Sequence, residues 1–179
     1  MYEEPRELFL TFHFDTNRIN SRGKLENMNK LEGWRDRDLI LLYPSKVAHE
    51  EAMAGGDPLR ARKALENIYS FTMATTAEET QRLAEIEAVV FPAGAQTQNE
   101  RNDVEIAFNA GKYGTILITA DEDLLRCRPE LARFGIRIMT DDEAVLLVER
   151  RIAERDERAR GLSAEMGMPL PDWVGKDFL

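Results

Sequence analysis

The sequence contains four acidic residues whose carboxylates could act together in one site: Asp15, Glu50, Asp103 and Asp121. Asp15 directly follows an apolar run, and Asp121 lies two residues beyond a second one. A buried carboxylate has to be paired, protonated or bound to a cation. Several converging carboxylates repel one another unless a divalent ion joins them. The chemistry indicated by these residue types is therefore cation binding through oxygen.

Each of these residues also has a plainer interpretation. Any of the three aspartates could cap a helix, which is the most frequent role of Asp just before a helix. Glu50 lies three residues after the inward-facing Val47, but Glu51 lies four after it and could be the inward one instead. Taken together, the four residues favour a ligand-binding site, because all of them fall near the same end of the predicted strands.

The elements expected to carry these residues alternate between strands and helices. Strands are predicted at residues 8–14, 38–44, 115–119 and 136–140. Helices are predicted at 25–31, 45–54, 58–68, 76–90, 103–112 and 143–160, with a loop at 91–102. This order predicts an α/β fold, a three-layer α/β/α sandwich around a mostly parallel sheet of four to five strands. In such sheets ligands bind at the carboxyl ends of the strands.

Residues 1–141 are expected to form one domain, and residues 142–179 a long charged helix and an extended tail packed on it or projecting from it. The end of that helix, "ERRIAERDERAR", is nearly all charge, so we expect it to leave the core for solvent or a partner. Trp173 is expected to anchor the tail to the body or to another subunit.

Composition limits the classes of function. The 179 residues are 43% hydrophobic and 32% charged, which is typical of a globular protein. With Cys127, His13 and His49 alone, the chain has no zinc cluster. The net charge of 24 − 33 = −9 means that nucleic-acid binding would need a local basic patch. The absence of a membrane-length apolar run and of a basic leader predicts a cytoplasmic protein with no membrane partner.

Three segments, taken in order, resemble the PIN domains, a family of metal-dependent ribonucleases that includes the VapC-type toxins. The segments are "FDTN" (14–17), "PSKVAHEEA" (44–52) and "NDVEIAFNAGKYGTILITADEDLL" (102–125), and the resemblance frames residues 8 to about 140. It implies Mg²⁺ or Mn²⁺ as cofactor and single-stranded RNA as substrate. It also implies catalytic and metal-binding roles for Asp15, Glu50, Asp103 and Asp121, with Asp123 as a further ligand.

The resemblance also suggests residues around the substrate. Asn17 would orient Asp15 or a phosphate, and Thr119 would be a polar neighbour. Arg18 and Arg126 could steer phosphates, although a solvated surface is an equally good interpretation of both. Expected partners are RNA, an antitoxin-like protein and a second copy of the chain in a homodimer.

The resulting hypothesis is an endoribonuclease in which one or two ions activate water for in-line attack on a phosphodiester. One alternative is a catalytically silent protein of the same fold that acts as a binding partner. Another is a Mg²⁺-dependent, phosphatase-like hydrolase with an Asp nucleophile. That chemistry normally needs a second Asp two residues after the first, and position 17 is Asn.

Overall fold

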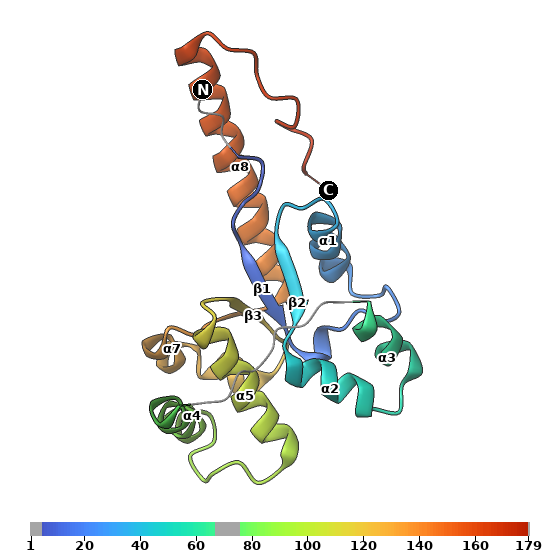
Figure 1. Ribbon diagram of the computed structural model, residues 1–179, viewed down its shortest axis with the longest axis vertical. Helices are drawn as coiled ribbons and strands as arrows, with labels where there is room; N and C mark the ends of the chain where they lie inside the picture. The colour runs from blue at the N-terminus through green and yellow to red at the C-terminus, as the bar shows by residue number, and fades with distance from the viewer. Residues whose placement is uncertain (1–4, 67–75, 179) are drawn as a thin grey trace.

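The computed structural model describes residues 5–66 and 76–178, and its centre is a parallel sheet (Figure 1). The four strands are β1 (Thr11–Phe14), β2 (Leu41–Pro44), β3 (Ile116–Ile118) and β4 (Arg137–Met139). They are all parallel and lie in the order β2-β1-β3-β4. The prediction of an α/β fold around a mostly parallel sheet of four to five strands is confirmed, with four strands that are all parallel.

Strand β1 lies inside the sheet and is buried on both faces. Phe12 and Phe14 point to one side and His13 to the other, and all three are buried. The ladder begins at Thr11 and not at Leu8 as expected, because Phe9 has a left-handed backbone (φ +52°) and its side chain is 78% exposed. β2 likewise starts three residues later than expected, after the left-handed Asp38.

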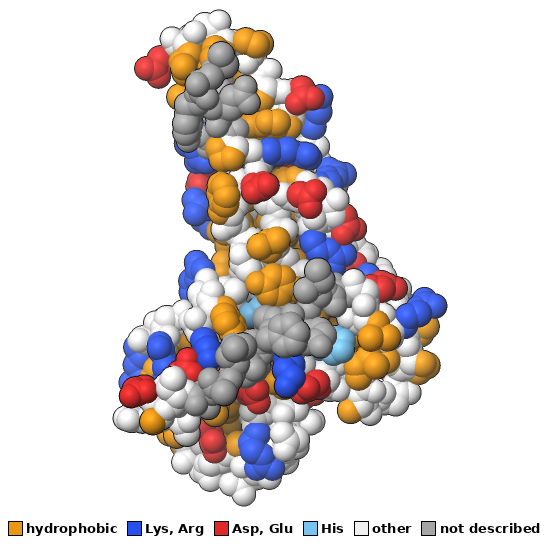
Figure 2. All heavy atoms as spheres, in the orientation of Figure 1, with side chains coloured by type: hydrophobic (Ala, Val, Ile, Leu, Met, Phe, Trp, Pro, Cys, Tyr) orange, Lys and Arg blue, Asp and Glu red, His pale blue; other side chains and the backbone are white. Residues whose placement is uncertain are grey.

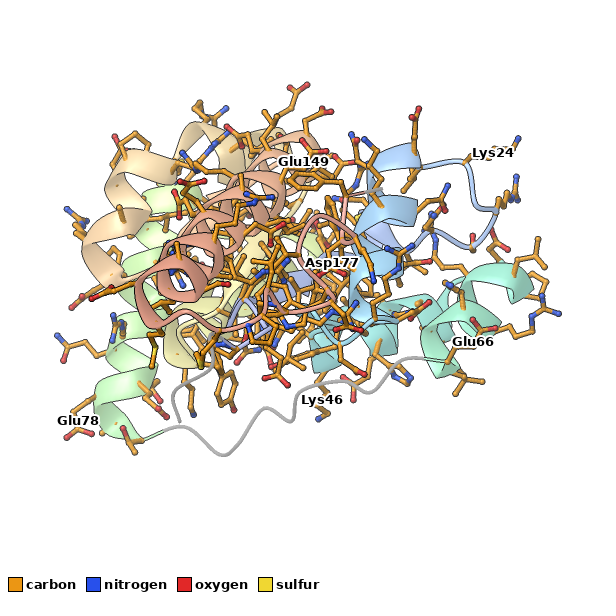
Figure 3. The ribbon with its side chains drawn as sticks, turned by 90° about the horizontal axis from the view of Figure 1, so that it is seen from above. Lys24, Lys46, Glu66, Glu78, Glu149 and Asp177 are labelled. Atoms are coloured by element: carbon orange, nitrogen blue, oxygen red, sulfur yellow. The ribbon has the colours of Figure 1, made fainter. Side chains whose placement is uncertain are left out.

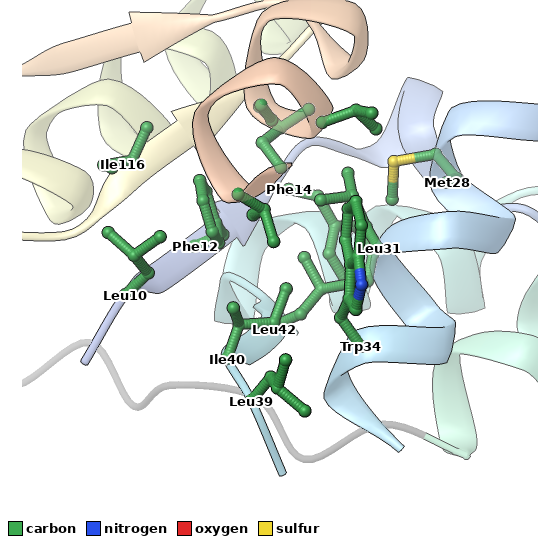
Figure 4. Packing of buried hydrophobic residues seen from close by; sticks show 14 of the residues in the cluster. Leu10, Phe12, Phe14, Met28, Leu31, Trp34, Leu39, Ile40, Leu42 and Ile116 are labelled. Carbon is green, nitrogen blue, oxygen red and sulfur yellow. The ribbon is translucent and has the colours of Figure 1, made fainter. Parts of the chain in front are cut away.

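Two helices cover one face of the sheet, α1 (Glu26–Arg35) and the first part of α8 (Asp141–Met166). Figure 4 shows the aromatic and aliphatic side chains of β1 packed against the apolar side of α1. The buried residues of this cluster include Phe12, Phe14, Met28, Leu31, Trp34, Leu42, Ile116, Ala144, Val148 and Ile152. The start of α8 therefore shares its core with the central strand.

The opposite face is covered by α4 (Ala77–Val90), α5 (Gln98–Lys112), α6 (Glu122–Arg126) and α7 (Arg128–Leu131). Leu117 and Ile138 of the sheet pack there against Ile106, Phe108 and Leu131. Helices α2 (Lys46–Ala54) and α3 (Pro58–Leu65) follow β2, and a 3-10 turn, η1 (Thr16–Arg18), follows β1. Helices thus lie on both faces of the sheet.

Capping chemistry sets where the helices of the second face begin. The predicted capping box of Thr76 and Glu79 opens α4. A second box, Thr97 with Glu100, opens α5 at Gln98, so the prediction of a loop through residue 102 was wrong at its end. Residues 98–102 consequently belong to the helix that carries Asp103.

The far end of α8 departs from the prediction in a different way. Figure 2 shows acidic and basic side chains interspersed along this helix, as expected for a solvated surface. Arg155 and Asp156, however, are each only 1% exposed. The helix also runs on to Met166 and ends at Gly167 in the left-handed conformation (φ +63°). The expectation that the whole charged stretch leaves the core was therefore wrong.

A buried ion-pair network holds the C-terminal tail to α8. The Arg155 guanidinium donates to Asp156 Oδ1 at 2.6 Å and to Asp177 Oδ2 at 3.0 Å. It also lies 4.4 Å from the Trp173 ring centroid, which agrees with the predicted anchoring role of Trp173. Asp177 lies between α8 and α1 (Figure 3), where its backbone oxygen accepts a hydrogen bond of 2.8 Å from Trp34 Nε1. The tail is thus fixed to both helices.

No helix within the described parts of the chain is both long enough and apolar enough to cross a membrane.

Replacing Arg155 by Met should destabilise the fold strongly. The variant leaves Asp156 buried without its guanidinium partner and leaves Asp177 with Arg6 alone, and we expect the free energy of unfolding to fall by about 3 kcal/mol. Urea unfolding followed by circular dichroism measures this change. Arg151→Met is the matched control, since Arg151 pairs with an exposed Glu154 and should change stability by less than about 0.5 kcal/mol. Equal losses in the two variants would contradict a stabilising role for the network.

Candidate functional site

The carboxyl ends of β1 and β3 meet at the point where the strand order reverses. β2 lies on one side of β1 and β3 on the other, so the connections that follow β1 and β3 run in opposite directions, and α/β sheets bind ligands at such a point. Phe14 is in register with Ile118, and the Asp15 amide donates to the Ile118 carbonyl at 3.0 Å. Asp15 and Thr119 therefore emerge side by side.

Asp15 is 3% exposed, and neutral donors satisfy its carboxylate. Oδ1 accepts from the Thr16 amide at 2.6 Å, so Asp15 does cap η1, as the plainer interpretation expects. Oδ2 accepts from Asn17 Nδ2 at 2.6 Å and from Thr119 Oγ1 at 2.7 Å. Burial raises the pKa of Asp15 above its usual value, against the lowering effect of the Thr119 and Thr16 hydrogen bonds.

Thr119 links Asp15 to Asp121. Its hydroxyl donates to Asp15 and accepts from the Asp121 amide at 2.9 Å. Asp121 in turn caps α6, because its Oδ1 accepts from the Leu124 amide at 2.9 Å. The Asn17 side chain completes the link, since its Oδ1 accepts from the Ala120 amide at 3.2 Å. The structure thus brings Asp15, Asn17, Thr119 and Asp121 together.

Asp103 lies on α5 and faces the same place. Burial, and next the negative charges of Asp15, Asp121, Glu51 and Asp123, raise the pKa of Asp103 from 3.8 to about 7. Within residues 5–66 and 76–178, no basic side chain forms an ion pair with Asp15, Asp103 or Asp121. The structure therefore concentrates negative charge here without a cationic side chain to balance it.

Glu51, and not Glu50, points toward this cluster. One Glu51 carboxylate oxygen accepts from Thr16 Oγ1 and the other from Asn102 Nδ2 at 2.6 Å. The Glu50 side chain is 61% exposed and pairs with Lys46 at 3.4 Å. Lys46 projects outward in Figure 3, away from the body of the protein. The placement expected for Glu50 is therefore corrected in favour of its neighbour.

The inward face of α2 explains this correction. Val47, Ala48 and Ala52 are all buried, so the face that packs on the body runs through positions 48 and 52. Glu51 lies beside that line, whereas Glu50 lies outside it. The two small alanines four residues apart are the sequence signal for this face, and Val47 by itself left both glutamates open.

The remaining predicted residues lie at the margin of the cluster and already have partners. Asp123 contributes to the negative potential at Asp103 and pairs with Arg126 at 2.6 Å. Arg18 pairs with Asp141 at 3.2 Å, at the start of α8. Neither arginine is held against the buried carboxylates. We use "carboxylate cluster" below for Asp15, Glu51, Asp103 and Asp121.

Two observations bear on whether the carboxylate cluster could hold a metal ion. Its donors are carboxylate oxygens, and hard divalent cations such as Mg²⁺ and Mn²⁺ prefer such ligands. In the part of the chain that the structure describes, however, no three Asp, Glu, His or Cys side chains stand at ligand spacing. The donor chemistry therefore fits the ion, and binding would require these side chains to close on it.

Comparison with known proteins adds no assignment. No model of a known protein family matches the sequence. No curated protein matches it either.

Asp103→Asn should stabilise the metal-free protein above pH 7. The folded state holds this proton more tightly than the unfolded chain, so the wild type loses stability as pH rises from about 4 through about 7. Because Asp103 is partly solvent-screened, we expect the variant to gain about 1 kcal/mol at pH 8 and little at pH 5. Thermal unfolding across this pH range, with a chelator present, measures the difference.

Glu50→Gln is the control for that series, because the Glu50 carboxylate is exposed and lies away from the carboxylate cluster. A stabilisation by Asp103→Asn that is the same at pH 5 and pH 8 would contradict the electrostatic account of the carboxylate cluster.

Proposed function

We propose that this protein is a PIN-like, Mg²⁺- or Mn²⁺-dependent endoribonuclease that hydrolyses RNA phosphodiester bonds at the carboxylate cluster. The observation that carries the proposal is the convergence of four carboxylates, with no basic partner among the described residues, at the switch point of a parallel sheet. A bound divalent ion would compensate their repulsion. The resemblance of the sequence around Asp15, Asp103 and Asp121 to PIN domains supplies the reaction class.

Each residue has a defined task in this proposal. Asp15 is held rigid by Thr16, Asn17 and Thr119, so its free lone pairs have a fixed direction. Asp103 and Asp121 offer carboxylates from two further elements, and Glu51 supplies a fourth. When bound, the ion supplies charge stabilisation for the phosphate and acidifies a water molecule. The deprotonated carboxylates can accept hydrogen bonds from that water and orient it.

The hydrogen bonding of Asp15 argues against the phosphatase alternative. A carboxylate nucleophile needs an oxygen free to attack phosphorus, but both Asp15 oxygens accept hydrogen bonds inside a buried setting. Position 17 is occupied by Asn, whose amide orients Asp15 and cannot act as a general acid. Water is therefore the better nucleophile for this site.

The substrate part of the proposal rests on local charge. With a net charge of −9, the chain needs basic residues close to the carboxylate cluster to hold RNA. Arg126 suits this task, since its side chain is 67% exposed and its partner Asp123 lies on the surface of the same helix. Single-stranded RNA is flexible enough to bring a phosphate to the carboxylate cluster. An antitoxin-like partner, a homodimer and a cytoplasmic location belong to the same proposal.

The pair of adjacent glutamates gives a matched test of metal binding. We expect Mn²⁺ to raise the melting temperature of the wild type, because the ion binds only the folded cluster. Glu51→Gln removes one charge from the cluster and should weaken Mn²⁺ binding by about tenfold, whereas Glu50→Gln should leave it unchanged. Isothermal titration calorimetry measures both affinities. Equal behaviour of the two variants would refute the assignment of Glu51.

Cleavage requires a separate test. Asp15→Asn and Asp121→Asn keep the side-chain oxygen that caps η1 and α6. Because Asp15→Asn removes the oxygen that accepts from Asn17 and Thr119, thermal unfolding is used to verify that this variant is folded. We expect each to lose at least about 100-fold in the rate of Mn²⁺-dependent cleavage of a fluorescent single-stranded RNA. Undiminished cleavage would eliminate the proposed site. Mn²⁺ binding by the wild type without any cleavage would instead favour the catalytically silent alternative.

A further inference from the structure

Asn102 is a polar residue next to the carboxylate cluster that has no task in the mechanism above. It lies on α5, one residue before Asp103. Its Nδ2 donates to a Glu51 carboxylate oxygen at 2.6 Å, and its Oδ1 accepts from Gln98 Nε2 at 2.8 Å, one turn earlier on the same helix. The Asn102 amide is thus oriented from one side by Gln98 and directed at Glu51 on the other.

Glu51 is held from two directions by these contacts. Thr16 donates to one carboxylate oxygen from η1, next to Asp15, and Asn102 donates to the other from α5, next to Asp103. The Glu51 carboxylate therefore bridges the two elements that carry Asp15 and Asp103, the two aspartates of the carboxylate cluster whose pKa is raised. The position of the Glu51 carboxylate depends on both donors, because each of its two oxygens accepts a hydrogen bond from another element.

An open groove lies beside Glu51, and the Glu51 side chain could turn into it if the hydrogen bond from Asn102 were absent. The groove has a volume of about 320 Å³ and runs between α2 and α5. Its walls include Val47, Glu50, Gln98 and Glu105 as well as Glu51 and Asn102. A glutamate side chain has three rotatable bonds, and repulsion from the neighbouring aspartates favours turning away from them. The groove offers the space for that rotation.

We propose that Asn102 is a positioning residue that keeps the Glu51 carboxylate turned toward the carboxylate cluster and out of the α2–α5 groove. This inference rests on the proposed metal-dependent function. A neutral amide suits the task because it fixes the carboxylate without cancelling its charge. A lysine or arginine at this position would hold Glu51 too, but it would supply the positive charge that the cluster otherwise takes from an ion.

The test is a double-mutant cycle on Mn²⁺ affinity, measured by isothermal titration calorimetry. Asn102→Ala should weaken Mn²⁺ binding by about tenfold in the wild-type background. In the Glu51→Gln background the same change should cost less than about twofold, because the charged ligand that Asn102 positions is already gone. Asn99→Ala is the matched control on the same helix, since Asn99 is exposed on α5 and Asn102 keeps its bond to Glu51 in that variant.

The possible outcomes separate this inference from the proposed function. If the wild type binds Mn²⁺ and Asn102→Ala leaves the affinity unchanged, or weakens it equally in both backgrounds, the positioning role is wrong and the metal site stands. If the wild type does not bind Mn²⁺ at all, both are overturned. Thermal unfolding without metal verifies that Asn102→Ala is folded, as expected for alanine in the first turns of α5.

Discussion

The repulsion among carboxylates at the carboxyl ends of β1 and β3 is the constraint on which the rest of the site depends. Asp15, Glu51, Asp103 and Asp121 come from four separate elements, so no single loop can relax to move them apart. The strand order puts them at the reversal point of the sheet, and helix packing keeps them there. A fold that only needed helix caps would not gather all four at one point.

The neighbours of these carboxylates share one property, which is that they donate hydrogen bonds without carrying charge. Thr16, Asn17, Thr119 and Asn102 satisfy carboxylate oxygens through hydroxyl or amide groups. Such donors fix the geometry of a buried carboxylate and leave its negative charge in place. The charge is therefore available to an external cation, and these hydrogen bonds hold Asp15 and Glu51 in place before the cluster closes on it.

The sequence predicted the frame of this arrangement better than its details. The apolar run ending in Asp15 and the "TILIT" run before Asp121 each give a strand with an acidic end, and the parallel sheet follows from the alternation with helices. The choice between Glu50 and Glu51 stayed open because helical spacing from one apolar residue cannot distinguish adjacent positions. The position of Asn102 was not predicted, because its segment was expected to be a loop. The capping box of Thr97 and Glu100 makes this segment the start of α5.

Two other features, the burial of Arg155 and the raised pKa of Asp103, could not be predicted from any local sequence pattern. The burial of Arg155 depends on Asp177, twenty-two residues further along, and on Arg6, whose carbonyl accepts from the same guanidinium. A run of charges on a helix has the same local appearance whether solvent or a returning tail covers it. The raised pKa of Asp103 likewise depends on residues from three other elements. Both are consequences of tertiary contacts, which spacing along the chain does not encode.

Two buried aspartates in this protein show how differently it treats the same chemical group. Burial acts to raise the pKa of Asp177, but the hydrogen bonds and charges of Arg6 and Arg155 outweigh it and lower that pKa below its usual value. Asp15 is buried to a similar extent, yet its pKa is raised, since its partners are neutral and its charged neighbours are acidic. The chain thus balances a buried carboxylate with arginine where the contact is structural. Asp15 and Asp103 have no such partner in residues 5–66 and 76–178, which is consistent with a site whose positive charge comes from outside the chain.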